Sequence, residues 1–124
     1  MKYELSKCVV EQLSENIFQV TPHEGIVVDK NYLDEIWKLW DDLRDKQFGV
    51  LINCKNQFSR SFEGARDTGK HHLNQKVAFL CKEDDYHTKK HWALTKQIKK
   101  MTAGNIHHQF FTDRDEAIKW LSDI

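Results

Sequence analysis

The chain has 124 residues, which is enough for one domain with its own hydrophobic core, and its 19 acidic and 19 basic side chains cancel. A net charge of zero supports neither a nucleic-acid binder nor an acidic-surface protein, and we expect no nucleic-acid partner. The N-terminus lacks a signal-peptide pattern, and no apolar run reaches membrane-spanning length. We therefore expect a soluble, cytoplasmic protein without a transmembrane segment.

The first half of the chain alternates β-rich runs with an amphipathic stretch. Residues 7–13 and 17–21 are separated by a short polar turn, which predicts a hairpin. Asp29 is the predicted cap of a helix that runs to about residue 46, because apolar side chains recur there on one helical face. Residues 48–54 form a nearly continuous apolar run, typical of a strand that is covered on both faces.

The second half continues the alternation and ends with the clearest local signal in the chain. Asp113 and Glu116 have the spacing of a capping box, and the apolar residues that follow recur on one face of a final helix. Before it, the pattern predicts a helix over 62–73, a buried strand over 76–81, a helix over 86–101 and a strand over 106–111.

The predicted order is therefore β-β-α-β-α-β-α-β-α in a single domain covering residues 1–124. Strands that alternate with helices of this length indicate right-handed crossovers and parallel pairing. We expect an α/β fold with a mixed, mostly parallel central sheet flanked by helices. The opening hairpin would leave one edge strand uncovered, which would allow a homodimer.

This order and its ending resemble the SpoIIAA-like proteins of the STAS superfamily (sulfate transporter and anti-sigma factor antagonist), a subgroup often placed with Sec14-type lipid-binding folds. The resemblance covers essentially the whole chain. It depends on the opening hairpin, on Gly25 and Val27 in the bend before the first helix, on the strand at 50–53, and on the segment 110–121.

Anti-sigma factor antagonists of this superfamily carry a serine at the start of the second helix that a partner kinase phosphorylates. Ser61 lies nearest that position here, with Arg60 and Phe62 in place of the family's aspartate and second serine, and with the glycine displaced to Gly64. The resemblance makes Ser61 a candidate phosphorylation site and implies a regulatory protein partner. The alternative is that Ser61 only caps the helix.

Polar residues follow the predicted parallel strands at their carboxyl ends, where open α/β sheets bind ligands. Helix N-termini at this edge would favour an anionic group. The residues expected there are Asn53, Lys55, Asn56, Ser59, Arg60, Ser61, Lys82, Tyr86, His87 and Thr112.

The second predicted helix has little apolar bulk, because Gly64, Ala65 and Gly69 lie along it. Such a face indicates either a close backbone contact or a cleft beneath the helix. From the cleft and the resemblance we expect a non-enzymatic domain that binds an apolar, lipid-like small molecule with an anionic head group. The predicted ligand-binding residues are Lys55, Phe58, Arg60, Phe62 and Gly64, with the two cations on the anionic end.

The histidines and cysteines do not predict catalysis or metal binding. His87 and His91 have the i, i+4 spacing of many zinc pairs, but no matching carboxylate follows. Three cysteines far apart in the sequence, without a CxxC pair, do not indicate a disulfide framework, so we expect buried thiols. We therefore expect no catalytic residue, no metal and no cofactor.

Overall fold

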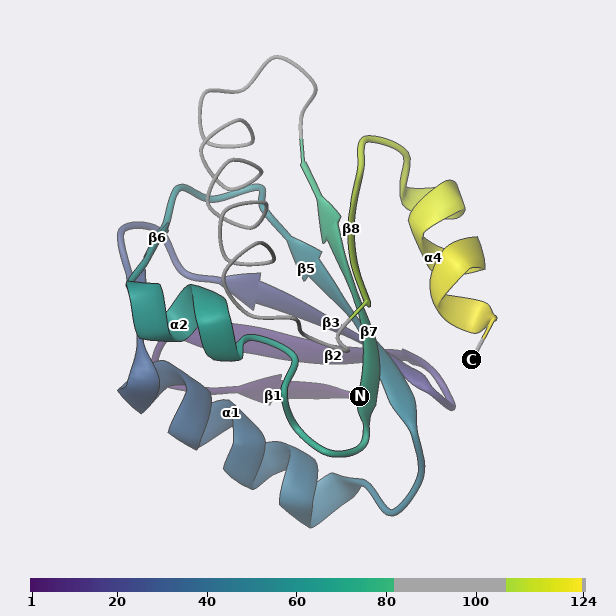
Figure 1. Cartoon of the computed structure of the whole chain (residues 1–124), viewed down its shortest axis with the longest axis horizontal. Helices are drawn as coiled ribbons and strands as arrows, with labels where there is room; N and C mark the ends of the chain where they lie inside the picture. Colours follow the sequence, from purple (N-terminus) through teal and green to yellow (C-terminus); the bar gives the residue numbers. More distant parts are fainter. Residues whose placement is uncertain (82–106, 124) are drawn as a thin grey trace.

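An open six-stranded sheet forms the centre of the computed structural model, which describes residues 1–81 and 107–123 (Figure 1). In spatial order its strands are β1 (Lys2–Glu4), β2 (Cys8–Ser14), β3 (Ile17–Pro22), β5 (Phe48–Asn53), β7 (Asn74–Leu80) and β8 (His107–Phe111). The first three strands pair antiparallel, whereas β3, β5, β7 and β8 pair in parallel. The expected mixed, mostly parallel sheet is confirmed.

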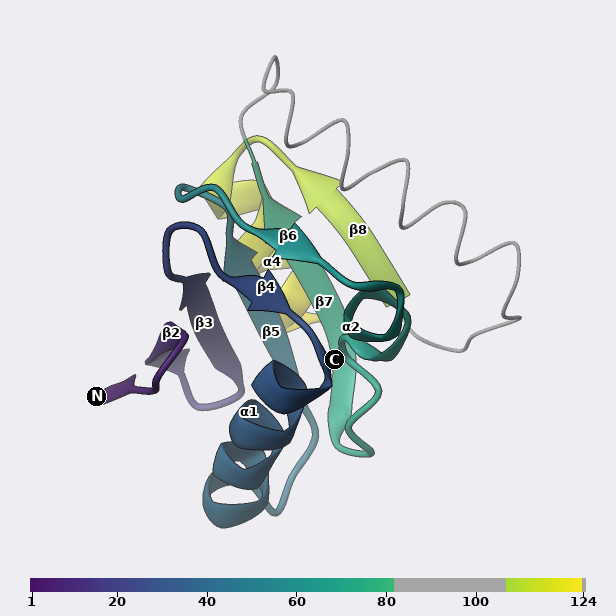
Figure 2. The same ribbon diagram turned by 90° about the vertical axis from the view of Figure 1, so that its left-hand side faces the viewer.

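Helices cover both faces of this sheet. Helices α1 (Lys30–Leu43) and α2 (Phe62–Asp67) lie on one face, and α4 (Arg114–Ser122) lies on the other (Figure 1). A second, two-stranded parallel sheet pairs β4 (Val27–Val28) with β6 (Ser59–Arg60), beside the starts of α1 and α2 (Figure 2). In the part of the chain that the structure describes, no helix is long and apolar enough to cross a membrane.

The middle strand β5 is buried on both faces, as its apolar run predicts. Val50 and Ile52 pack into the larger core cluster with α1, while Leu51 points to the other side. There it meets Ala117 and Leu121 of α4, and all three side chains are fully buried. Each face of the sheet therefore needs its own helix layer.

Two predicted helix starts are confirmed by the capping geometry. The Asp29 side chain accepts a hydrogen bond from the Tyr32 backbone N–H at 3.0 Å, and Asp113 accepts one from the Asp115 backbone N–H at 2.9 Å. The helix predicted over residues 86–101 lies outside the described residues.

The predicted length of α2 was wrong, since the helix ends at Asp67 instead of residue 73. Thr68 leaves the helical conformation, and its hydroxyl donates to the Gly64 carbonyl oxygen at 2.5 Å. Gly69 follows with a φ of +84°, a left-handed conformation that glycine adopts without steric cost. Strands β1, β4 and β6 were not predicted, because runs of two or three residues are too short to show alternation.

The small face of α2 contacts the backbone of β4. A Cβ atom added at Gly64 would overlap the Val28 carbonyl oxygen and lie 2.6 Å from its carbon. At this position the glycine allows two backbone segments to meet, and it does not open a cleft.

We predict that Gly64→Ala lowers the free energy of unfolding by about 1–3 kcal/mol, the usual cost of overpacking a close contact. Chemical denaturation measures this, with Glu63→Ala, an exposed neighbour in the same helix, as the control expected to change stability by less than about 0.5 kcal/mol. Equal stability of the two variants would contradict the close packing of α2 on β4.

A second prediction concerns Cys8, which is only 1% exposed and whose thiol pKa burial raises from 9.0 to about 11. Since the unfolded chain loses this proton first, the thiol's contribution to stability is complete below pH 9 and is lost as the pH rises toward 11. The full loss corresponds to about 2–3 kcal/mol.

Urea unfolding at about pH 8 and about pH 10, in the presence of a reductant, checks this prediction. The free energy of unfolding should fall less steeply with pH in Cys8→Ala than in the wild type, because all other titrating groups are shared. Parallel pH profiles for the two proteins would show that Cys8 does not cause the dependence.

Candidate binding site at the carboxyl edge of the sheet

A groove of about 500 Å³ lies across the carboxyl ends of β5, β7 and β8. This volume is within the range of small-molecule sites, and the position is the one where open α/β sheets bind ligands. The described residues that line the groove are Asn53, Cys54, Lys55, Leu80, Cys81, Thr112 and Arg114.

The charged groups along this groove are positive. Lys55 and Arg114 are both exposed and belong to different segments, one after β5 and one at the start of α4. No acidic side chain is among the described lining residues. The Arg114 guanidinium also donates to the Gln19 Oε1 atom at 2.5 Å, which holds its position above β3. Two such cations suit a carboxylate or phosphate group.

Neutral groups complete the lining. Asn53 and Thr112 supply an amide and a hydroxyl, and the Asn53 side chain accepts from the Lys55 backbone N–H at 3.1 Å. Leu80, Cys54 and Cys81 add apolar surface to the lining. The groove can therefore contact both an anionic group and a short apolar group of one small molecule.

The polar residues predicted at this edge lie in different places. Asn53, Lys55 and Thr112 line the groove, whereas Asn56 donates to the Pro22 carbonyl oxygen at 3.1 Å. Ser59 and Arg60 form β6 above the sheet. Lys82, Tyr86 and His87 lie outside the described residues, as does His91.

The predicted apolar ligand residues are not brought together around one cavity. Phe58 is 4% exposed and belongs to the core, while Phe62 is 48% exposed, with the Arg66 guanidinium 5.7 Å from its ring centroid. Gly64 packs on Val28, as described above. Among the described lining residues of the groove, Lys55 is the one that belongs to the five predicted ligand-binding residues.

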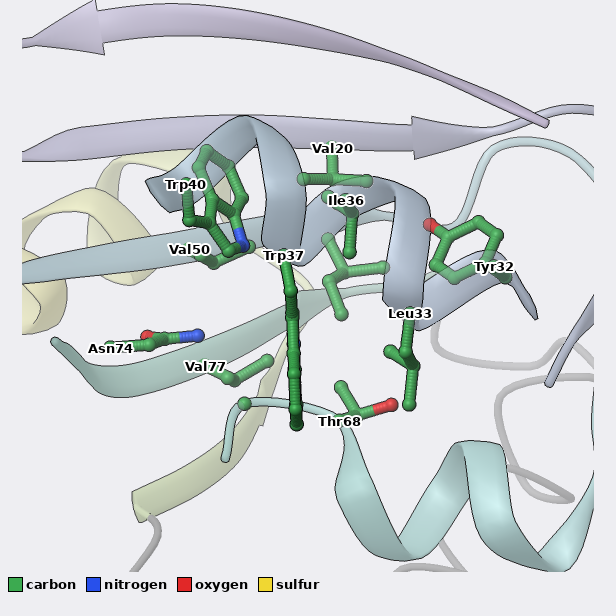
Figure 3. A pocket seen from close by; sticks show the side chains of 12 residues that line it. Val20, Tyr32, Leu33, Ile36, Trp37, Trp40, Val50, Thr68, Asn74 and Val77 are labelled. Atoms are coloured by element: carbon green, nitrogen blue, oxygen red, sulfur yellow. The ribbon is translucent and has the colours of Figure 1, made fainter. Parts of the chain in front are cut away.

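A largely apolar pocket does lie under α1, next to the segment that follows α2, but it is small. Figure 3 shows its lining by α1 side chains and by the segment after α2, toward which Trp37 extends. Its volume is about 30 Å³, enough for a water molecule and far below what an acyl chain requires. Its lining residues are Val20, Tyr32, Leu33, Ile36, Trp37, Trp40, Val50, Ile52, Thr68, Gly69, Asn74 and Val77.

The Arg60 side chain extends from β6 toward Phe79 of the main sheet and is half-buried. Its guanidinium carbon is 5.2 Å from the centroid of the Phe79 ring. Burial lowers the pKa of this guanidinium from its usual value to about 10, while the nearby thiols of Cys54 and Cys81 act in the opposite direction. Arg60 therefore keeps its positive charge at neutral pH, close to both cysteines.

Ser61 caps α2, in agreement with the structural alternative for this residue. Its hydroxyl oxygen accepts from the Gly64 backbone N–H at 3.0 Å and its hydroxyl donates to the Val28 carbonyl oxygen at 3.4 Å. The side chain is half-buried, between β4 and the first turn of the helix.

The described histidines lie apart from the groove or form structural contacts. His71 is 6% exposed and precedes β7, at the opposite edge of the sheet, where its Nε2 atom lies 2.7 Å from Asp41 Oδ1. His108 Nε2 is 3.0 Å from the Thr68 carbonyl oxygen. Within residues 1–81 and 107–123, no group of three His, Cys, Asp or Glu side chains is arranged to hold a metal ion.

Comparison with known proteins identifies the fold. No family model and no curated protein matches the chain. Among solved structures, it is similar to an uncharacterized protein of the DUF3478 family from Shewanella loihica PV-4, described as having a SpoIIAA-like fold. The match covers 98% of each chain, with a TM-score of 0.56 and 18% sequence identity.

The fold is SpoIIAA-like. This confirms the resemblance expected from the order of elements and from the closing strand and helix. At 18% identity the likeness concerns the fold alone, because the same fold carries different functions. The function of this SpoIIAA-like chain has to be argued from its own groove.

Sequence reasoning missed Arg114 as a site residue. The available signal was its position directly after Thr112 and Asp113, since the residue that follows a parallel strand and opens a helix lies at the carboxyl edge.

Proposed function

We propose that this SpoIIAA-like domain is a non-enzymatic binding domain whose ligand is a small anion with a short apolar part. The observation that supports this proposal is the groove at the carboxyl edge, which Lys55 and Arg114 line together with Leu80 and the two cysteines. The cations bind the carboxylate or phosphate, and the apolar surface selects the group attached to it.

The size of the ligand follows from the packing of the core. Because the pocket between α1 and the sheet is only about 30 Å³, an acyl chain cannot enter there without displacing core side chains. The ligand therefore lies in the open groove. The expected ligand is therefore a short amphipathic anion instead of a long-chain lipid.

Binding of a homologous set of probes to the purified protein tests this proposal. We expect hexanoate and hexyl phosphate to raise the melting temperature and to give saturable heats of binding, and neutral hexanol to do neither. Binding should weaken as the salt concentration rises, because Lys55 and Arg114 are exposed.

Variants locate the binding in the groove. Lys55→Gln and Arg114→Gln should each weaken binding of hexyl phosphate by roughly tenfold, the loss of one charge-assisted hydrogen bond. Lys38→Gln removes the same charge from the exposed side of α1 and should leave affinity unchanged. Equal affinity in all three variants, or no binding of either anion to the wild type, would refute a binding function of this groove.

A second candidate function is a protein interaction at the turn around Ser61. It is favoured by two exposed apolar side chains near Ser61, Val27 at 43% and Phe62 at 48% exposure. In this function a regulatory protein contacts the turn, and phosphorylation of Ser61 would add charge between the two side chains.

Affinity capture from the source cell distinguishes this second function. We expect Ser61→Asp to lose a partner that both the wild type and Ser61→Ala retain, or to gain one that both lack, because only the aspartate introduces charge at the turn. Identical partner sets for the three baits would exclude a charge switch at Ser61.

A further inference from the structure

Two cysteines that are distant in sequence lie side by side at the carboxyl edge. Asn53 of β5 pairs with Leu80 of β7, and the Cys54 backbone N–H donates to the Leu80 carbonyl oxygen at 3.0 Å. Cys54 and Cys81 are therefore the next pair in the parallel register. Neighbouring strands are about 5 Å apart, so the two α-carbons are at about that distance.

Their side chains point to the same face of the sheet. Ile52 and Phe79, which precede them by two residues and pair with each other, both belong to the core cluster beneath α1. Cys81 is a buried member of that cluster, and Cys54 packs against it. Because side chains alternate along a strand, the two cysteine side chains lie on this same face, on neighbouring strands.

The estimated α-carbon separation falls within the range found for disulfides. Bonded cysteines usually have α-carbons about 4.4–6.8 Å apart. Cys8 is in a different position, since it pairs with Pro22 of β3, and β3 separates it from β5. Its distance from Cys54 is thus about two strand spacings, or about 10 Å, which exceeds that span.

We infer that Cys54 and Cys81 form a thiol–disulfide exchange site for a low-molecular-weight disulfide that enters through the groove. The site needs no anionic ligand, so it stands independently of the proposed binding function. The small disulfide is the oxidant and the two protein thiols are the reductant.

The reaction proceeds in two balanced steps. The Cys54 thiol loses its proton to solvent, and the thiolate attacks one sulfur of the small disulfide, forming a mixed disulfide and releasing one small thiolate. The Cys81 thiol then loses its proton, and its thiolate attacks the Cys54 sulfur and displaces the second small thiolate. One intramolecular disulfide and two small thiols result, once the released thiolates take up the protons.

The different exposure of the two cysteines indicates which of them attacks the small disulfide first. Cys54 is half-buried and Cys81 is 6% exposed, although both line the groove, so the small disulfide meets Cys54 first. The positively charged Arg60 lies within electrostatic range of both sulfurs and attracts the thiolates that the two steps require. Cys8 is buried at 1% exposure with its thiol pKa raised to about 11, so it stays protonated.

Oxidation of the folded protein tests the inference. Wild type, Cys8→Ala, Cys54→Ser and Cys81→Ala are incubated with excess oxidised glutathione at neutral pH, and then acid-quenched for intact-mass measurement and peptide mapping. Circular dichroism first confirms that each variant is folded. Hexyl phosphate is left out, so that failure of anion binding cannot affect the result.

We expect wild type and Cys8→Ala to lose the mass of two hydrogens and to yield one linked peptide pair containing Cys54 and Cys81. Cys81→Ala should stop at a glutathione adduct on Cys54. Cys54→Ser should remain unmodified, or react at least roughly tenfold more slowly, because Cys81 is buried.

Three results would overturn the inference. The first is a stable glutathione adduct on Cys54 in the wild type without closure to Cys81. The second is a bridge that includes Cys8. The third is no reaction at Cys54 under conditions in which the urea-unfolded chain reacts completely.

Discussion

The burial of β5 on both of its faces is the constraint on which the remaining structure depends. Val50 and Ile52 face α1 while Leu51 faces α4, so neither face of this strand is exposed to solvent. A strand of this kind needs a partner strand at each edge and a helix layer on each face. Parallel crossovers meet both needs at once, and they bring the carboxyl ends of β5, β7 and β8 to one edge.

Two cations and two cysteines lie at that edge. Lys55 and Arg114 are far apart in sequence, yet each lies two or three residues after the end of a parallel strand, and both line the same groove. The same register places Cys54 beside Cys81. Charge, apolar surface and thiols thus converge without any local motif, which explains why a SpoIIAA-like fold alone is a weak guide to ligand chemistry.

The core between α1 and the sheet is packed too tightly for a large ligand. The contact between Gly64 and Val28 brings α2 onto β4, and the early end of α2 at Thr68 leaves only a cavity of about 30 Å³ under α1. A small-faced helix was compatible with a cleft or with close packing. The backbone contact at Gly64 shows that this face packs closely. The groove described above, with a volume of about 500 Å³, lies at the carboxyl edge instead.

The sequence by itself determined the elements that carry strong local signals. The two-sided strand near residues 48–54, the closing strand and the helix capped by Asp113 follow from periodicity and capping, which depend on neighbouring residues. Lys55 and Thr112 could be placed at the carboxyl edge for the same reason. Only the tertiary structure decided the two- and three-residue strands and the end of α2 at Asp67. It also decided that Arg114 and Lys55 line one groove and that Cys54 lies beside Cys81. They depend on hydrogen-bond register and packing between distant segments, for which single-chain patterns contain no direct signal.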